Sequence, residues 1–325
     1  MTILPFALFK RPRPRCSLTL FCFIFVCLVA ARPCVRAQSS HACAPDQLRE
    51  RMEEIARATG GPVGAAAVII EGGEVVSFNG AQRFPMQSVY KMPIGMAVLR
   101  AVDEGRLKLT RKIFVRPEDL VPERLYSPLR DANPRGVELT LRELLRLMIS
   151  ESDGTASDVL LGIAGGPEKV TEYLRGLGVE GVTVATSERA MAEGDEQVQY
   201  RNWATPESML SLLRALQEGR GLSRASRGLL LDFMLKSTPG PRRLKGMLPA
   251  GTPVAHKTGT SGTVEGVTRA TNDVGLVTLP DGRHMAVAVF VSDTKADADV
   301  REGSIAKIAR AAWDCWTTGA RRRRR

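Results

Sequence analysis

The order of the predicted elements constrains the fold of this chain most strongly. Two segments near the start of the body, 63–70 and 74–78, have strand composition and are joined by a Glu-Gly-Gly turn. The next strand patterns come only after residue 250, at 252–261, 271–279 and 284–292. From 87 to 236 the apolar residues recur almost wholly at helical spacing. The pattern therefore predicts a chain that leaves a sheet, builds a helical lobe and returns to the same sheet.

Amphipathic helices are predicted at both ends of this body, at 46–59 and at about 296–316. Together the elements predict an α+β fold, with a five-stranded antiparallel sheet flanked by the terminal helices and an inserted all-helical lobe. We expect a single domain over 38–320, divided into an α/β lobe (44–84 plus 237–317) and a helical lobe (85–236). A ligand site is expected where the lobes meet.

Start signals mark two helices of the middle segment. Thr140 and Glu143 form a capping box before an apolar run, and Thr205 precedes Pro206 at a first helical position.

The positive charge lies in two tails. The chain has 46 Lys and Arg against 35 Asp and Glu, a net charge of +11. Six basic residues within 1–37 and the five arginines of 321–325 account for this whole excess, so the body between them is neutral. Nucleic-acid binding by the folded part is therefore not expected. The 321–325 tail is interpreted as solvated.

The N-terminal tail has the pattern of an export signal. Basic residues up to Arg15 precede an apolar run over 16–31, and Val35-Arg-Ala37 offers a cleavage site. This predicts a signal peptide over 1–37, a periplasmic or secreted protein, and no stable membrane association after cleavage. The alternative is an uncleaved anchor, but the run is shorter than the roughly 20 residues that span a bilayer.

Cysteine and histidine placement gives no metal site. Four of the six cysteines precede residue 38, which leaves Cys43 and Cys315 as a possible disulfide or as two free thiols. His41, His256 and His284 lack ligand spacing, and a surface or loop position is expected for each. We expect neither a metal nor a cofactor.

Ser88 and Lys91 form the first chemical motif. They lie one helical turn apart at a loop-to-helix junction, so the amine can reach the hydroxyl and take its proton. Backbone N–H groups at the helix start can stabilise a developing oxyanion. By itself the motif is weak, because a solvated lysine three residues after a serine is common.

Two further motifs follow in order. Ser152-Asp-Gly154 comes after a predicted helix end near Ile149, and Lys257-Thr-Gly259 lies on a predicted strand. Ser-x-x-Lys, Ser-Asp-Asn and Lys-Thr-Gly are the motifs of class A β-lactamases and penicillin-binding proteins. Their order here indicates a serine nucleophile.

Together with these motifs, three further segments make the sequence resemble the class A serine β-lactamases over about residues 44–316. The segments are Tyr126-Ser-Pro128, 197–203 and 248–273. The PER-type extended-spectrum branch is the most similar. The resemblance implies a β-lactamase/transpeptidase-like fold, small-molecule β-lactam antibiotics as substrates, and a monomer.

The resemblance also implies catalytic roles. Ser88 attacks the lactam carbonyl and carries the acyl group, Lys91 handles its proton, and Ser152 relays a proton to the leaving nitrogen. Glu188 matches the base that activates the deacylating water, although Ala192 stands where the family has Asn. The alternative for Glu188 is a solvated acidic loop.

The implied substrate-binding residues lie mainly on the late strand. Lys257, Thr258 and Thr260 bind the substrate carboxylate, and the N–H groups of Ser88 and Thr260 form the oxyanion hole. Arg243 adds positive charge behind Lys257, or else is a solvated surface residue. Gly154 replaces an Asn that contacts the substrate side chain. The full substrate-binding set is Tyr126, Gly154, Arg243, Lys257, Thr258, Gly259, Thr260 and Ser261.

Two other functions use the same motifs. A D-Ala-D-Ala peptidase shares the three motifs, and the Glu188 loop argues against it. A β-lactam-binding sensor would acylate Ser88 and stall, which the departures at Gly154 and Ala192 keep open.

Overall fold

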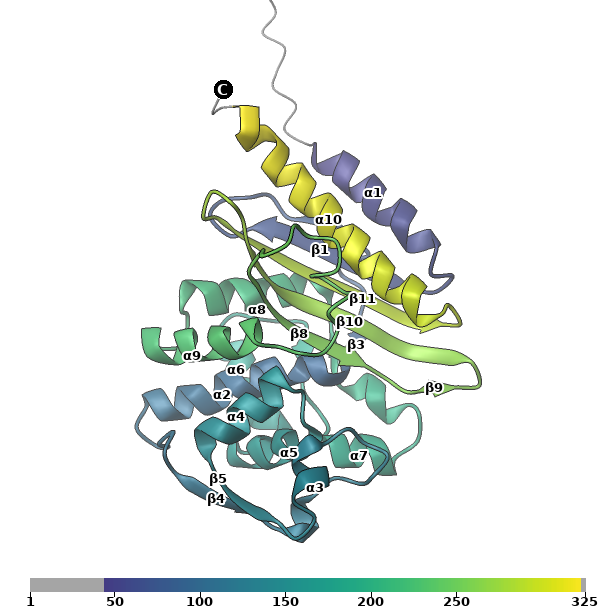
Figure 1. Ribbon diagram of the computed structural model, residues 1–325. Coiled ribbons are helices and arrows are strands. Elements are labelled where there is room, and N and C mark those ends of the chain that lie inside the picture. The colour runs from purple at the N-terminus through teal and green to yellow at the C-terminus, as the bar shows by residue number, and fades with distance from the viewer. Residues whose placement is uncertain (1–43, 323–325) are drawn as a thin grey trace, which may run out of the picture. The chain divides into compact units, whose positions relative to one another are not determined.

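The computed structural model describes residues 44–322, which belong to the second of the two compact units of the chain. Five strands form an antiparallel sheet in the order β2-β1-β11-β10-β8, which confirms the predicted sheet (Figure 1). A short sixth strand, β9 (Thr263–Val264), pairs antiparallel with the first residues of β10. The five strands are β1 (Val63–Ile69), β2 (Val76–Phe78), β8 (Val254–Thr260), β10 (Val267–Thr278) and β11 (His284–Thr294).

The sheet is buried on both faces, because alternate residues of each strand enter different cores. In β1, Ala65 and Ala67 belong to one apolar cluster, and Ala66 and Val68 to the other. The terminal helices α1 (Pro45–Arg57) and α10 (Ala298–Arg322) cover the first face, and the inserted helices cover the second (Figure 1). Strands buried in this way have continuous apolar sequences, which is why the sheet was predictable.

The inserted segment packs its helices around α2 and over the sheet. The capping box at Thr140 starts α4, and Thr205 caps α8, both as predicted. The helices are α2 (Lys91–Asp103), α3 (Pro128–Ala132), α4 (Leu141–Ser150), α5 (Gly154–Ile163), α6 (Pro167–Gly176), α7 (Glu188–Glu193), α8 (Pro206–Glu218) and α9 (Arg224–Leu235).

The prediction of an all-helical insertion is wrong in two places. One two-stranded antiparallel sheet pairs β4 (Lys112–Val115) with β5 (Val137–Thr140) across a long connection. A small sheet joins β3 (Phe84–Pro85), β7 (Trp203–Ala204) and β6 (Val182–Thr183). These strands have two to four residues and pair with distant segments, so they leave no periodicity for sequence analysis to detect. The segment also contains the 3₁₀ turns η1 (Gln87–Tyr90), η2 (Pro117–Asp119) and η3 (Val198–Arg201).

The last helix is longer than predicted, since α10 continues past residue 316 to Arg322. Cys315, on this helix, is disulfide-bonded. The other five cysteines all precede residue 44, so the partner and the predicted pairing with Cys43 lie outside the described residues. So do the predicted signal peptide and His41. Within residues 44–322, no helix has the length and apolar character to cross a membrane.

Candidate active site

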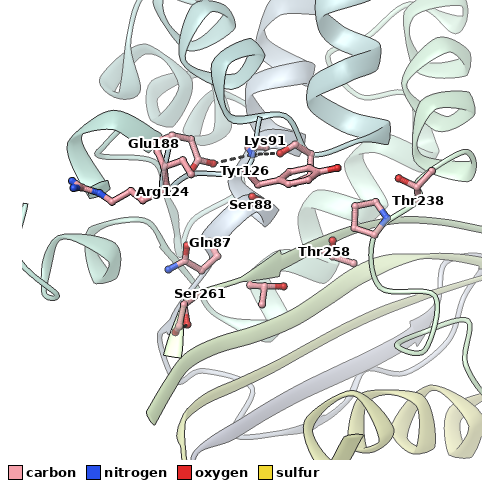
Figure 2. A pocket seen from close by; sticks show the side chains of 14 residues that line it. Gln87, Ser88, Lys91, Arg124, Tyr126, Glu188, Thr238, Thr258 and Ser261 are labelled. Carbon is pink, nitrogen blue, oxygen red and sulfur yellow. Dashed lines mark hydrogen bonds and ion pairs between the residues drawn. The ribbon is translucent and has the colours of Figure 1, made fainter. Parts of the chain in front are cut away.

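A cavity of about 590 Å³ lies between the sheet edge at β8 and the inserted helices (Figure 2). η1 and the start of α2, the α4–α5 turn, α7 and β8 each contribute side chains to it. Eight of its residues were predicted from the sequence: Ser88, Lys91, Tyr126, Ser152, Glu188, Thr258, Thr260 and Ser261.

Ser88 and Lys91 lie on either side of a change of helix type and line the same cavity. Ser88 lies half-buried in η1, and Lys91 is the first residue of α2. The Lys91 side chain is buried, with Nζ 2.7 Å from the Ser152 carbonyl oxygen and 2.9 Å from Glu188 Oε1 (Figure 2). A buried ammonium requires such partners, because its desolvation is costly.

Ser152 lies at the centre of the polar contacts. Its φ of +62° is unfavourable for a non-glycine residue and is held by the turn between α4 and α5. Asp153 fixes this turn by capping α5 through Ala156 N–H and by accepting from Leu129 N–H. The Ser152 hydroxyl accepts from Lys257 Nζ at 2.9 Å. Ser152 therefore joins both lysines, one through its carbonyl and one through its hydroxyl.

Lys257 is fully buried on β8. Its ammonium also donates to the Thr258 carbonyl, 3.0 Å away. Burial and the nearby positive charge of Lys91 lower the pKa of Lys257. Within the described residues Lys257 has no ion pair with a carboxylate, and the negative charges of Asp273 and Glu188 oppose only part of the lowering of its pKa.

Glu188 is the first residue of α7 and is mostly buried. Ser187 caps this helix, and the carboxylate of Asp158 accepts from the N–H groups of Glu188 and Arg189 at 2.8 and 2.9 Å. Burial raises the pKa of Asp158 to about 6, against these two hydrogen bonds that lower it. Thus α5 holds the start of α7 and, with it, the Glu188 side chain beside Lys91.

Gly259 allows β8 to approach η1 closely. A Cβ on this residue would lie 2.3 Å from the Met86 carbonyl oxygen. Asn272 of β10 supports the same junction, since its amide donates to the carbonyls of Pro85 and Met86. These contacts set Ser88 against the strand that carries Thr258 and Thr260.

Comparison with known proteins identifies this arrangement. Residues 47–316 match the β-lactamase enzyme family. The chain belongs to that family. The extended-spectrum β-lactamase PER-1 of Pseudomonas aeruginosa is 38% identical over 268 residues, 82% of this chain and 86% of its own. β-Lactamase VEB-1 of the same species is 37% identical over 271 residues, 83% of this chain and 90% of its own.

A solved β-lactamase from Chitinophaga pinensis is 46% identical and superimposes with a TM-score of 0.80, covering 82% of this chain and 98% of its own. The protein is a class A serine β-lactamase that hydrolyses β-lactams. The predicted family, fold class and enzyme class are confirmed.

Arg243 of this β-lactamase is buried and does not line the cavity. Its guanidinium lies behind β8, donating to the carbonyls of Gly259 and Asn272 and, at 2.7 Å, to Thr260 Oγ1. Glu302 of α10 pairs with its Nε at 3.1 Å. The solvated alternative is therefore wrong, and Arg243 reaches the cavity only through Thr260.

His256 corrects another expectation. It is fully buried on β8, with Nδ1 2.9 Å from the carboxylate of Asp273, which is also fully buried. Asp273 in turn accepts from Leu244 N–H. Sequence analysis placed His256 at the surface because the partner carboxylate comes from the neighbouring strand. His284 does lie near the surface, paired with Glu71.

Gly154 begins α5 and does not line the cavity. Its N–H donates to the Tyr126 carbonyl, and a Cβ there would lie 3.1 Å from that oxygen. The cavity also contains residues that sequence analysis missed, most of them next to a motif. They are Gln87, Arg124, Leu125, Thr238, Pro239 and Gly262.

Proposed function

We propose that Ser88 is the nucleophile of this β-lactamase and that Lys91, Ser152 and Glu188 move its protons. The observation that carries this proposal is the pair of contacts at Lys91 Nζ, to the Ser152 main-chain carbonyl at 2.7 Å and to the Glu188 carboxylate at 2.9 Å, in the cavity that Ser88 also lines. The carboxylate can exchange a proton with the amine, and the carbonyl holds the amine in the cavity that the Ser88 and Ser152 side chains line.

Acylation joins Ser88 Oγ to the lactam carbonyl carbon and breaks the carbon–nitrogen bond. Lys91 takes the Ser88 proton in its neutral form. The Ser152 hydroxyl accepts from Lys257, so its own hydrogen is free to pass to the leaving nitrogen, and Lys91 then replaces that hydrogen. The N–H groups of Ser88 and Thr260 stabilise the oxyanion.

Deacylation uses Glu188 as general base. Its carboxylate takes a proton from a water molecule, whose oxygen attacks the ester carbon. The bond from this carbon to Ser88 Oγ breaks, and Oγ receives a proton from Lys91, which Glu188 then reprotonates with the proton taken from water. Glu188 suits this role because it is mostly buried, faces the cavity and is held at the start of α7.

The substrate carboxylate binds at the β8 side of the cavity. Lys257, fully buried behind the cavity lining, supplies positive charge, and the lining residues Thr258 and Thr260 supply hydroxyl donors. Since Arg243 donates to Thr260 Oγ1, that hydroxyl directs its own hydrogen elsewhere, toward the bound carboxylate. Tyr126, with an exposed ring, forms the opposite rim.

Stopped-flow hydrolysis of a chromogenic cephalosporin tests the proposed turnover. Sustained turnover after any burst supports the Glu188 mechanism. A burst of one equivalent followed by no further product would support the stalled sensor instead. Selective turnover of a D-Ala-D-Ala peptide would support the peptidase.

We also propose that the enzyme acts as an exported monomer. The support is the 1–37 signal pattern and the absence of a membrane-spanning helix within residues 44–322. The partners we expect are β-lactams, with neither nucleic acid nor a stable membrane contact. The boundaries between the two lobes, at residues 84 and 237, remain predictions. Size-exclusion chromatography with light scattering and N-terminal sequencing of periplasmic protein test the oligomeric state and the cleavage site.

A Cys43–Cys315 disulfide fits an exported protein. Cys315 is disulfide-bonded, and Cys43 is the one cysteine that follows the proposed cleavage site and precedes α1. Non-reducing peptide mapping of periplasmic protein should show this pair. Two titratable thiols in that protein would contradict it.

A further inference from the structure

Two arginines link α7 to the segment that forms the Tyr126 side of the cavity. We call residues 118–126 the wall segment. Arg189, which follows Glu188 on α7, donates from one guanidinium nitrogen to the carbonyls of Glu118 and Leu120 at 2.9 and 2.8 Å. Arg124, on the wall segment, donates in the opposite direction to the carbonyl of Ala192 on α7. These reciprocal contacts form an arginine clasp.

The α7 end of the clasp is adjacent to the catalytic carboxylate. The main-chain N–H groups of Glu188 and Arg189 share the carboxylate of Asp158, so this turn is fixed on its α5 side. The Arg189 side chain fixes the same turn on its wall-segment side. A helix of six residues has little stability of its own, so such external contacts decide where Glu188 lies.

The wall segment is a firm support for the clasp. Arg130 of α3 donates from Nη1 to the carbonyls of Val121, Pro122 and Leu125, at 3.2, 2.6 and 2.9 Å. Gly154 N–H binds the Tyr126 carbonyl at 3.1 Å. The segment is therefore held by α3 and α5 independently of α7.

The second contact of the clasp lies where this chain departs from its family. Ala192 has no side-chain amide with which to orient water or its own helix. Its carbonyl receives the Arg124 guanidinium instead. Figure 2 shows that guanidinium on the Glu188 side of the cavity and directed away from Lys91. Arg124 therefore contacts the end of α7 rather than the lysine.

We infer that Arg124 and Arg189 are positioning residues that hold Glu188 for deacylation. The inference rests on the proposed role of Glu188 as the base. The clasp does not contact Ser88, Lys91, Ser152 or Lys257, so it acts on acylation only indirectly, through the contact of Glu188 with Lys91. Because a small displacement of a general base lowers the rate strongly, loss of the clasp should slow deacylation more than acylation.

The test compares Arg189→Gln, Arg124→Gln and the double variant with the wild type. Arg175→Gln, on the exposed face of α6, is the matched control for loss of one positive charge. Stopped-flow kinetics with a chromogenic cephalosporin give the acylation and deacylation rates, and mass spectrometry gives the steady-state fraction of acyl-enzyme. Glu188→Gln is measured in parallel.

Each clasp variant should lower the deacylation rate by about tenfold to a hundredfold and slow acylation less, while the Arg175→Gln control stays as in the wild type. The fold-decrease in the deacylation rate of the double variant should be smaller than the product of the two single fold-decreases, because both contacts hold the same helix. If Arg189→Gln lowers the unfolding temperature, Arg189→Lys serves as a second variant, because it keeps the charge but not the planar guanidinium. It should also slow deacylation more than acylation.

Glu188→Gln should accumulate acyl-enzyme. If it does, but the clasp variants slow acylation and deacylation equally or show no rise in acyl-enzyme, the positioning role of the clasp is wrong. If Glu188→Gln itself turns over normally, the proposed base is wrong and the inference fails with it.

Discussion

The two sides of the cavity each bury a lysine, and the lysines differ in their partners. The helical wall, formed by Ser88, Lys91, Ser152 and Glu188, pairs Lys91 with a carboxylate at 2.9 Å. The strand wall, formed by β8, gives Lys257 only the Ser152 hydroxyl and the Thr258 carbonyl. Within the described residues, Lys91 has an ion pair with a carboxylate and Lys257 has none.

This difference separates proton transfer from anion binding. An amine in contact with a carboxylate can exchange a proton with it. A buried ammonium that has no carboxylate in contact gains from a substrate that brings a negative charge. Changes in the helical wall should therefore alter the chemical steps, and changes in the strand wall should alter KM.

The two walls are also supported differently. The strand wall is fixed by the main-chain ladder to β10 and by Asn272. The helical wall at α7 depends on side chains, namely Asp158 and the arginine clasp. Its geometry should respond more to single substitutions and to pH.

The largest effect is expected for Glu188→Gln. Loss of the base should leave acylation intact and lower deacylation by about a thousandfold, within the range of general base catalysis. Mass spectrometry after penicillin treatment should show a stable adduct, and Ser88→Ala should show none. Turnover at the wild-type rate would assign the base elsewhere, with Glu193 as the next candidate.

Lys257→Gln should raise KM by about tenfold to a hundredfold, because the substrate carboxylate loses a charged hydrogen bond. Steady-state kinetics with a penicillin and a cephalosporin measure this change. Lys236→Gln, at an exposed position after α9, is the control. A fall in kcat at unchanged KM would place Lys257 in the chemistry and remove the contrast between the walls.

Asp158 should give the helical wall a pH dependence near pH 6. Its ionised form accepts from the α7 amides, so deacylation should increase by up to about tenfold as pH rises through 6. The folded pKa is raised, so the contribution of Asp158 to stability is full below its unfolded pKa and is lost as pH rises toward 6.

The measurement is a pair of profiles between pH 4.5 and pH 7.5, one of the deacylation rate and one of the unfolding temperature. Asp158→Asn, which does not titrate, should flatten both profiles. If its profiles match those of the wild type, another group causes the pH dependence.

The smallest effect is expected for Gly154→Ala. The added Cβ would lie 3.1 Å from the Tyr126 carbonyl, so the wall segment must shift by a few tenths of an ångström. We expect kcat/KM to fall by about threefold, a loss under 1 kcal/mol. Gly162→Ala, on the same helix with nothing within 4 Å of the new Cβ, should keep activity. Unchanged kinetics for Gly154→Ala would show that the wall segment yields freely.

Sequence analysis found the parts of the site that lie within continuous motifs. Ser88 with Lys91, Ser152 with Gly154, and Lys257 with Thr258 are close in sequence, and local structure alone sets their mutual spacing. It missed Arg124, and it misjudged His256, because their decisive contacts come from other elements. Arg124 meets Ala192, and His256 meets Asp273 of the adjacent strand.

The sequence by itself determined the alternation of sheet and helices, since burial on both faces leaves continuous apolar strands and amphipathic helices. It also gave the proposed reacting groups, because each motif is local. Only the tertiary structure decided that, within residues 44–322, Lys91 has a carboxylate partner and Lys257 has none, that Arg243 lies behind the strand, and that two arginines contact α7 and the wall segment. Those facts depend on contacts between residues far apart in the chain, and no local pattern encodes such contacts.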